Sequence, residues 1–550
     1  MNRLQPLLNC LAVVVLCLAS AAWVVAAEPA VSIVDAAKSN DIDAVRRGLK
    51  EGVAVNSSEP DGSTALHWAV RQNNIEMTRL LIAAGANPAA ATRYSITPLY
   101  LAASNGNAQT IELLLKAGVD VNAAVLEGQT ALMTAALHGD PEAVRVLLAR
   151  GARVDVREPV KGQTALMWAA GEGNAEAIKL LLKAGADVDV KSQAGFTALL
   201  FAVLNDRIDA ARALLEGGAK ANDVAPDGTS ALNMAAVNAY YDVASLLLDF
   251  AADPNLPDPR GSTLHTLAWL RKPGATGSAA VGGDLRGPPV PNGAVTSLEL
   301  IKKLLARGAK PDTRVYVGER RFSKLGGAST NPPNIELGRH ILTYDGATPF
   351  WLAANNGDVD YMRVLLAHGA NPTIPNKFGV TPLMVAAGLN YYEGETPGPF
   401  TGTPEEERLE AVKLTLETGN DLHARADFGA YRMAGEPKYI AYYYPLNIEE
   451  LVDLGTGDPR WDGSTALHGA VVSGQPSIAQ FLIEKGAKVD AVNDAGWTPL
   501  LLSRGFFLAN AEKVYPEVEK VLIKAYEAQR LPIPDRIPVP RPIGEAVLER

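Results

Sequence analysis

The stretch GSTALHWA at residues 62–69 recurs as GQTALMTA at residues 128–135 and as GQTALMWA at residues 162–169. Its first position, which is Gly at every site but one, falls at residues 62, 95, 128, 162, 195, 228, 261, 346, 379, 463 and 496. Successive positions are 33 or 34 residues apart, except for two gaps of 85 and 84 residues. A period of this length indicates a repeat architecture in which two repeats carry extra residues.

Each repeat carries signals for two helices and a loop. In the first, Gly62 permits the positive φ of a tight turn, and Thr64 can cap a helix by accepting a backbone N–H bond. A polar break at Asn73-Asn74 precedes residues 75–83, which are apolar at helical spacing, and Gly85 stops this second helix. The pattern predicts helix, turn, helix and hairpin loop, with an apolar face that only the next repeat can cover.

The motifs Thr97-Pro98-Leu99, Thr381-Pro382-Leu383 and Thr498-Pro499-Leu500, together with the Gly-Ala-Asp/Asn helix endings, resemble ankyrin repeats. The resemblance implies an all-α ankyrin-repeat solenoid of about twelve helix pairs with hairpin loops and four insertions. The insertions are expected at residues 271–297, 312–345, 389–407 and 424–462.

The repeats and insertions predict a division of the chain into eight segments. These are a signal peptide at 1–27, an N-terminal capping repeat at 28–60, ankyrin repeats at 61–270, an interrupted repeat with two insertions at 271–345, ankyrin repeats at 346–388, a second interrupted repeat with two insertions at 389–462, C-terminal repeats at 463–530 and a Pro-rich tail at 531–550.

Two repeats depart from the pattern. The repeat at Ser95 lacks the turn glycine. The repeat at Gly261, aligned without a gap, has His265 where Leu is expected, whereas a one-residue deletion would restore a Leu264-His265 pair.

The N-terminus has the features of an export signal. Arg3 precedes an apolar stretch from Leu11 to Leu18, and residues 25–27 offer the small side chains of a cleavage site. We expect an exported protein, periplasmic or secreted and of bacterial origin, and a membrane association only if the signal stays uncleaved. No other stretch is long and apolar enough to span a bilayer.

Composition narrows the function. Both cysteines, Cys10 and Cys17, lie in the signal, so the mature chain can form no disulfide and no thiolate metal site. The net charge of −10 disfavours nucleic acid, which needs clustered Lys and Arg.

No catalytic motif is present. There is no Gly-x-Ser-x-Gly elbow, phosphate-binding loop or His-Glu-x-x-His helix, and the histidines lack metal-ligand spacing. We expect no enzyme activity, no catalytic residue, no metal and no cofactor. His67 and His468 are expected to bridge neighbouring backbones, and Trp68, Trp168, Phe201 and Trp351 are expected to pack in the core.

The resemblance implies that a concave face, lined by hairpin tips and by residues late in each first helix, binds an unidentified protein partner. Carried over to this sequence, the expected partner-binding residues are Arg71, Gln72, Arg93, Tyr94, Ser104, Asn105, His138, Lys161, Asn205, Asn238, Asn355 and Asn356. This mixed polar set favours a protein partner over a small apolar ligand.

Two alternatives stay open. One is a ligand-binding protein or enzyme whose site is built from the insertions, with Arg320, Arg321, His340, Tyr431, Arg432 and Tyr444 as its polar groups. The other is a structural component of the cell envelope, anchored by an uncleaved signal.

Overall fold

Paired helices make up most of the described chain. The computed structural model describes residues 32–256, 261–271, 290–315, 346–389, 403–427, 461–494, 496–508 and 511–534. The chain divides into two compact units, unit 1 up to Ala198 and unit 2 from Leu199 onward. The expected signal at 1–27, most of the four insertions and the tail beyond residue 534 lie outside the described residues.

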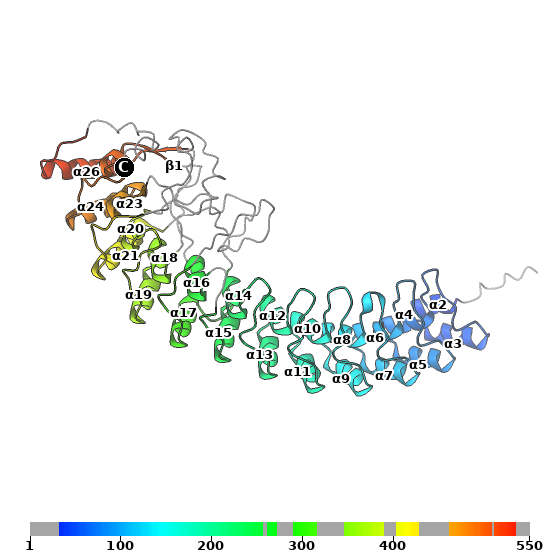
Figure 1. Cartoon of the computed structure of the whole chain (residues 1–550). Coiled ribbons are helices and arrows are strands. Elements are labelled where there is room, and N and C mark those ends of the chain that lie inside the picture. Colours follow the sequence, from blue (N-terminus) through cyan, green and yellow to red (C-terminus); the bar gives the residue numbers. More distant parts are fainter. Residues whose placement is uncertain are drawn as a thin grey trace, which may run out of the picture. The chain divides into compact units, whose positions relative to one another are not determined.

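Unit 1 is a row of first helices packed on a row of second helices (Figure 1). The pairs are α2 (Ile33–Lys38) with α3 (Ile42–Lys50), α4 (Ala65–Arg71) with α5 (Ile75–Ala83), α6 (Pro98–Ser104) with α7 (Ala108–Lys116), α8 (Ala131–His138) with α9 (Pro141–Ala149), and α10 (Ala165–Glu172) with α11 (Ala175–Lys183). A short 3₁₀ turn, η1 (Leu126–Gly128), forms one hairpin tip.

Unit 2 continues the same alternation. Its helices are α12 (Ala198–Leu204, which begins at the last residue of unit 1), α13 (Ile208–Glu216), α14 (Ala231–Val237), α15 (Tyr241–Asp249), α16 (Thr263–Arg271), α17 (Ser297–Ala306), α18 (Pro349–Asn355), α19 (Val359–Ala367), α20 (Pro382–Ala386), α21 (Glu405–Glu417), α23 (Ala466–Val472), α24 (Pro476–Glu484), α25 (Pro499–Ser503) and α26 (Pro516–Ala528). The all-α repeat fold is confirmed. Between α25 and α26 the chain adds an antiparallel hairpin of β1 (Phe506–Leu508) and β2 (Ala511–Lys513), which helical periodicity did not predict.

The local signals act as expected. The Thr97 hydroxyl accepts the N–H of Tyr100 at the start of α6, and Asn107 caps α7 in the same way. Gly62 has φ 88°, and a Cβ there would lie 3.2 Å from the Cα of Thr92 in the next hairpin. Ser95, where the turn glycine is missing, still adopts φ 58°, so this hairpin keeps its shape in a conformation that most non-Gly residues avoid.

Two insertions leave the hairpins that they interrupt closed at the base. An ordinary hairpin is closed by Val125 N–H to Gln129 O at 2.9 Å and Gly128 N–H to Val125 O at 3.0 Å. The same two backbone hydrogen bonds join Val315 to residues 346 and 347, at 2.7 and 2.9 Å. It also joins Ala426 to residues 463 and 464, at 2.9 Å for both bonds. The repeat frame therefore survives on both sides of each insertion.

The other two expected insertions are shorter than predicted at their C-terminal ends. Helix α17 begins at Ser297, and α21 begins at Glu405 although the insertion was expected to reach 407. Three consecutive glutamates open α21, where negative charge is favoured by the helix dipole.

Three histidines bridge consecutive repeats. His67 Nδ1 accepts the Thr64 N–H at 3.1 Å, while its Nε2 lies 3.1 Å from the carbonyl oxygen of Ile96 in the next hairpin. His468 makes the equivalent bonds to Thr465 and Trp497, so the bridging role expected for both residues is confirmed. His265 does the same with Ser262 and Ala347, which confirms the one-residue deletion in the repeat at Gly261.

Trp351 replaces the bridging histidine in its repeat. It is fully buried, as expected, and its Nε1–H donates to the carbonyl of Val380 at 2.8 Å. Val380 precedes Thr381, just as Ile96 precedes Thr97, so the indole reaches the acceptor that a histidine reaches elsewhere. This bond explains why Trp351 stands one position before the other repeat aromatics.

We expect Trp351→Phe to lower the free energy of unfolding by about 0.5–1.5 kcal/mol, because the substitution removes this buried hydrogen bond while the Val380 carbonyl keeps the N–H of Asn376 as a donor. Urea unfolding followed by circular dichroism measures the loss. Trp68→Phe is the matched control, since the Trp68 indole N–H bonds a partly exposed carboxylate. Equal losses in the two variants would show that the buried bond contributes nothing specific.

The repeat at Gly261 is joined to the following repeat by a buried ion pair. Arg271 Nε and Nη2 donate to Asp358 Oδ2 and Oδ1 at 2.7 and 3.1 Å, with side chains 12% and 2% exposed. Asp358 Oδ1 also accepts the N–H of Tyr361, whose hydroxyl donates to the carbonyl of Leu264 at 2.8 Å. The divergent repeat is thus held to its neighbour by buried polar contacts.

Candidate functional site

The exposed side chains with binding chemistry in unit 1 gather on its hairpins and first helices. We call this surface the hairpin face and define it by the hairpins 58–64, 92–96, 125–129 and 158–163 and the exposed positions of α4, α6, α8 and α10. Tyr94 is 57% exposed and Val160 56%, and both lie at hairpin tips. No other large hydrophobic side chain in the described part of unit 1 is comparably exposed.

Trp68 is the centre of the first part of the hairpin face. Its ring lies 4.8 Å from Lys38 Nζ and 5.4 Å from the Arg71 guanidinium, measured to the ring centroid. Its Nε1–H donates to Glu59 Oε2 at 2.8 Å, and Lys38 Nζ donates to Glu59 Oε1 at 2.9 Å. The hydrogen bond and charge of Glu59 raise the pKa of Lys38. Trp68 is half-buried, so the prediction that it is a core residue was wrong.

The next hairpin carries a second stacked cation. The Arg93 guanidinium lies 5.4 Å from the centroid of the Tyr94 ring, and the Arg93 backbone N–H donates to the carbonyl of Asp61. Asp61 in turn accepts the N–H and the hydroxyl of Ser63 at 2.8 and 2.9 Å, and these bonds lower the pKa of its carboxyl group. Hairpins 58–64 and 92–96 are therefore joined side by side.

The hairpin at 158–163 is held by a buried carboxylate of its own, that of Glu158. Glu158 is only 4% exposed, and its carboxylate accepts backbone N–H bonds from Val160, Lys161 and Gln163 at 2.7 to 2.9 Å. Burial opposes ionisation, but these three bonds prevail and lower the pKa of Glu158. This carboxylate fixes the tip that presents Val160 and Lys161.

Several of the expected binding residues form hydrogen bonds within the chain, either between repeats or within their own helix. Gln72 Nε2 donates to the carbonyl of Lys38 at 2.7 Å, and Asn105 Nδ2 donates to the carbonyl of Val70 at 2.9 Å. Asn205 and Asn238 donate to carbonyls of their own helices, those of Phe201 and Met234. Ser104 and His138 lie 3.3 Å apart across two repeats, with His138 exposed.

Asn355 and Asn356 require a correction. They were expected on the free surface, but they are 7% and 1% exposed. Asn356 Nδ2 donates to the carbonyl of Ala268, in the preceding repeat, at 2.9 Å. Asn105 bonds the carbonyl of Val70 in its own preceding repeat in the same way. Each side chain therefore bridges two repeats at the end of a first helix. A role in partner contact for Arg71, Arg93, Tyr94, His138 and Lys161, which are exposed, stays a prediction.

The other aromatic residues expected in the core differ in burial according to their position in the repeat. Trp168 and Phe201 share the repeat position of Trp68 and are half-buried, whereas Trp351 is fully buried. In later repeats of unit 2 the same position is occupied by Met234, Leu352, Val385 and Leu502, which are at most 6% exposed. Half-exposed apolar rings at this position are therefore a feature of the early repeats.

The sequence did not single out Lys38, Glu59, Glu158 or Val160. Arg71 follows Trp68 by three residues on one helix, a spacing that places the two side chains on one face and could have indicated the stacked pair. Lys38 and Glu59 come from other repeats, so no local pattern connects them to Trp68.

No metal-binding group of three or more His, Cys, Asp or Glu side chains occurs among the described residues. The six polar residues that would form a site on the insertions, from Arg320 to Tyr444, all lie outside the described residues. Across the described ranges, no helix combines the length and apolar content that a membrane crossing requires.

The chain is similar to known ankyrin-repeat proteins. It is 27% identical over 187 residues to the ankyrin repeat and KH domain-containing protein mask-1 of Caenorhabditis elegans, an alignment that covers 33% of this chain and 6% of that protein. Solved structures that match include the ankyrin repeat domain of Bcl-3, a member of the IkappaB protein family, at 27% identity and a TM-score of 0.35. That match covers 38% of this chain and 96% of the solved chain. The human ASB11 ankyrin repeat domain matches at 26% identity and a TM-score of 0.37, covering 40% and 96%.

The family patterns cover most of the repeat array. The pattern described as "Ankyrin repeats (3 copies)" matches residues 33–125, 122–192, 172–258 and 294–394. The pattern described as "Ankyrin repeat" matches residues 462–494. Together these segments span more than half of the sequence, and the chain belongs to the ankyrin-repeat family.

Proposed function

We propose that this chain is an exported binding module that docks a protein partner on the hairpin face of unit 1. Ankyrin repeats generally bind proteins and are usually not enzymes. The observation that carries the proposal is the placement of Tyr94 and Val160, the two large hydrophobic side chains left exposed in the described part of unit 1, at hairpin tips of one face. Exposed apolar side chains with a polar surround are typical of protein interfaces.

The chemistry of the hairpin face suits a protein better than a small molecule. Tyr94, Val160 and half-buried Trp68 offer apolar contact area, while Arg71, Arg93 and Lys161 offer charge at their rims. Tyr, Trp and Arg are the residue types that contribute most to interface affinity when they lie near the centre of a contact. Export is supported by Arg3, the apolar stretch 11–18 and the small residues at 25–27.

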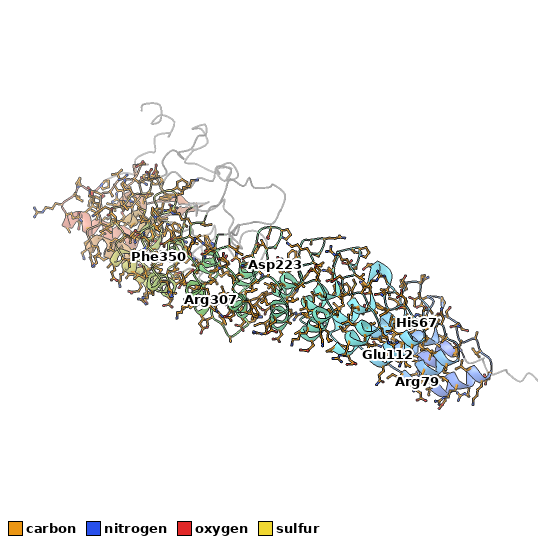
Figure 2. All side chains as sticks on the ribbon, turned by 60° about the horizontal axis from the view of Figure 1, so that its bottom comes forward. His67, Arg79, Glu112, Asp223, Arg307 and Phe350 are labelled. Carbon is orange, nitrogen blue, oxygen red and sulfur yellow. The ribbon has the colours of Figure 1, made fainter. Side chains whose placement is uncertain are left out.

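Affinity capture tests the proposal. The full chain is used as bait in separate cell-envelope and cytosolic extracts, beside a variant with Tyr94, His138 and Lys161 changed to Ala. The control variant changes Arg79, Gln109 and Lys183 to Ala, which are exposed on the second helices. Arg79 is labelled in Figure 2 on the row of second helices. We expect an envelope protein that is retained by the chain and by the control but lost from the hairpin-face variant.

The other outcomes separate the alternatives. A partner that both variants retain would place binding outside the hairpin face. A partner found only in the cytosolic extract would contradict export. Bait that retains no specific protein while folded would favour a ligand-binding or enzymatic role for the insertions. Recovery of the natural protein in salt-washed membranes would favour an anchored structural component.

A further inference from the structure

The acidic groups at the start of the hairpin face are already satisfied within the chain. Both oxygens of Glu59 accept hydrogen bonds, from Lys38 and from the Trp68 indole. Both oxygens of Asp61 accept hydrogen bonds from Ser63. Neither carboxylate therefore has an oxygen left without a donor.

Two guanidinium groups near these carboxylates, those of Arg71 and Arg93, are stacked on aromatic rings. Arg71 and Arg93 form no ion pair with any residue in the described ranges, although the charge of Arg93 helps to lower the pKa of the Asp61 carboxyl group. Each guanidinium lies over an aromatic ring, Trp68 or Tyr94, at 5.4 Å. Stacking on a ring leaves the N–H edges of a guanidinium free to bind a carboxylate with two parallel hydrogen bonds. Both side chains are exposed, and hairpin 58–64 connects their surroundings, because Glu59 bonds the Trp68 indole and the Asp61 carbonyl bonds the Arg93 backbone.

We infer that this patch, made by Arg71, Trp68, Arg93 and Tyr94, binds an acidic segment of a protein partner in which an apolar side chain stands between two carboxylates. The inference rests on the proposed function and specifies the chemistry of the partner. The carboxylates pair with Arg71 and Arg93, and the apolar side chain contacts the exposed Tyr94 ring. Pre-stacked guanidinium groups favour this segment because little side-chain entropy is lost on binding.

The third hairpin determines which end of the bound segment is acidic. Glu127, at the tip of the third hairpin, is exposed and forms no ion pair with a described residue. A carboxylate over that tip would be repelled, so the acidic part of the segment lies over hairpins 58–64 and 92–96 and a neutral or basic part lies over Glu127.

A displayed library of random 15-residue peptides tests the inference on the folded full chain. The baits are the chain itself, the double variant Arg71→Gln with Arg93→Gln, and the control Arg79→Gln on α5. Glutamine keeps the side chains polar but removes the charge and the stacked guanidinium with its paired N–H donors. We expect the chain and the control to enrich peptides with Asp or Glu on both sides of an apolar residue, and the double variant to lose this enrichment.

The most enriched peptide, labelled with fluorescein, is then titrated by anisotropy. We expect binding to the double variant to be at least about tenfold weaker and binding to the chain to weaken with added salt. Enrichment of basic or uncharged peptides, no enrichment, or an acidic preference that survives in the double variant would each overturn the inference. Heparin has negative charge but no apolar side chain. If heparin displaced the labelled peptide as well as the unlabelled peptide does, the inference would also be overturned.

The two proposals can fail separately. If the Tyr94, His138 and Lys161 variant loses a captured partner but the peptide library shows no acidic preference, the hairpin face binds proteins and only the inferred chemistry is wrong. If capture does not depend on the hairpin face, the proposed function fails whatever the library shows.

Discussion

Lowering the pH from 7 to 4 is expected to remove roughly 3 kcal/mol of unfolding free energy for each of His265 and His468. Burial lowers the pKa of both imidazoles from 6.5 to about 4, an effect only partly offset by the hydrogen bonds to the carbonyls of Ala347 and Trp497. The Arg425 charge lowers the pKa of His468 further. Because Nδ1 of each ring already accepts a backbone N–H, protonation would place two donors against each other.

The sign of this pH dependence follows from the protonation of each histidine in the folded and unfolded chain. In the unfolded chain each histidine takes up a proton below about pH 6.5, whereas in the folded chain it stays neutral down to about pH 4. Stability is therefore full above pH 6.5 and declines as the pH falls towards 4. Urea midpoints measured at intervals between pH 7 and 4 give the slope, which is expected to be about 1.4 kcal/mol per pH unit for each histidine.

His265→Met and His468→Met separate this effect from acid titration elsewhere. Met133 and Met167 occupy the equivalent position in unit 1, so the side chain fits the repeat. Each variant is expected to have a shallower pH dependence between 6.5 and 4.5 than the natural chain, whatever its stability at pH 7. An unchanged slope in both variants would show that these histidines are not the groups that titrate.

Asp358→Ala is expected to lower the unfolding free energy by about 3–5 kcal/mol, because it leaves the Arg271 guanidinium buried without its counter-ion. The substitution also removes the N-cap of α19, where Asp358 Oδ1 accepts the N–H of Tyr361. Urea unfolding at pH 7 measures the loss, and circular dichroism at zero urea establishes that the variant folds.

The matched control is Asp249→Ala. Asp249 pairs with Lys303 and Arg307 in the same unit, but its side chain is 49% exposed. Exposed pairs contribute only about 0–1 kcal/mol, so this variant should be close to the natural chain. Similar losses in the two variants would contradict the view that burial gives the Arg271 pair its importance. Combining Asp358→Ala with Arg271→Met should recover part of the loss, because no unpaired charge then remains.

Much of the fold could be predicted because its signals are local. The Thr64 cap, the Asn74 break and the Gly85 stop lie within one repeat, and the next repeat shows the same three signals at Thr97, Asn107 and Gly118. The deletion at Gly261 could also be proposed, since Leu264-His265 is a motif that the sequence itself contains. The hairpin of β1 and β2 stands between the two helices of the repeat at Gly496, and the repeat pattern contains no signal for it.

The candidate site was harder to predict because position in a repeat does not determine what a side chain contacts. Asn105 and Asn356 occupy positions that were expected on the free surface, yet each amide bonds a carbonyl of the preceding repeat. Trp68 was expected in the core, but it lies half-buried between Lys38 and Arg71.

The sequence by itself therefore determined the helix pairs, their order and the histidine bridges, because caps, stops and apolar spacing act within a single repeat of about 33 residues. Only the tertiary structure decided which polar side chains stay free for a partner. Lys38, Glu59 and Trp68 come from three separate elements, and Arg271 meets Asp358 across 87 residues of chain. A side chain is left exposed or satisfied by neighbours that stacking supplies, and those neighbours are distant in sequence.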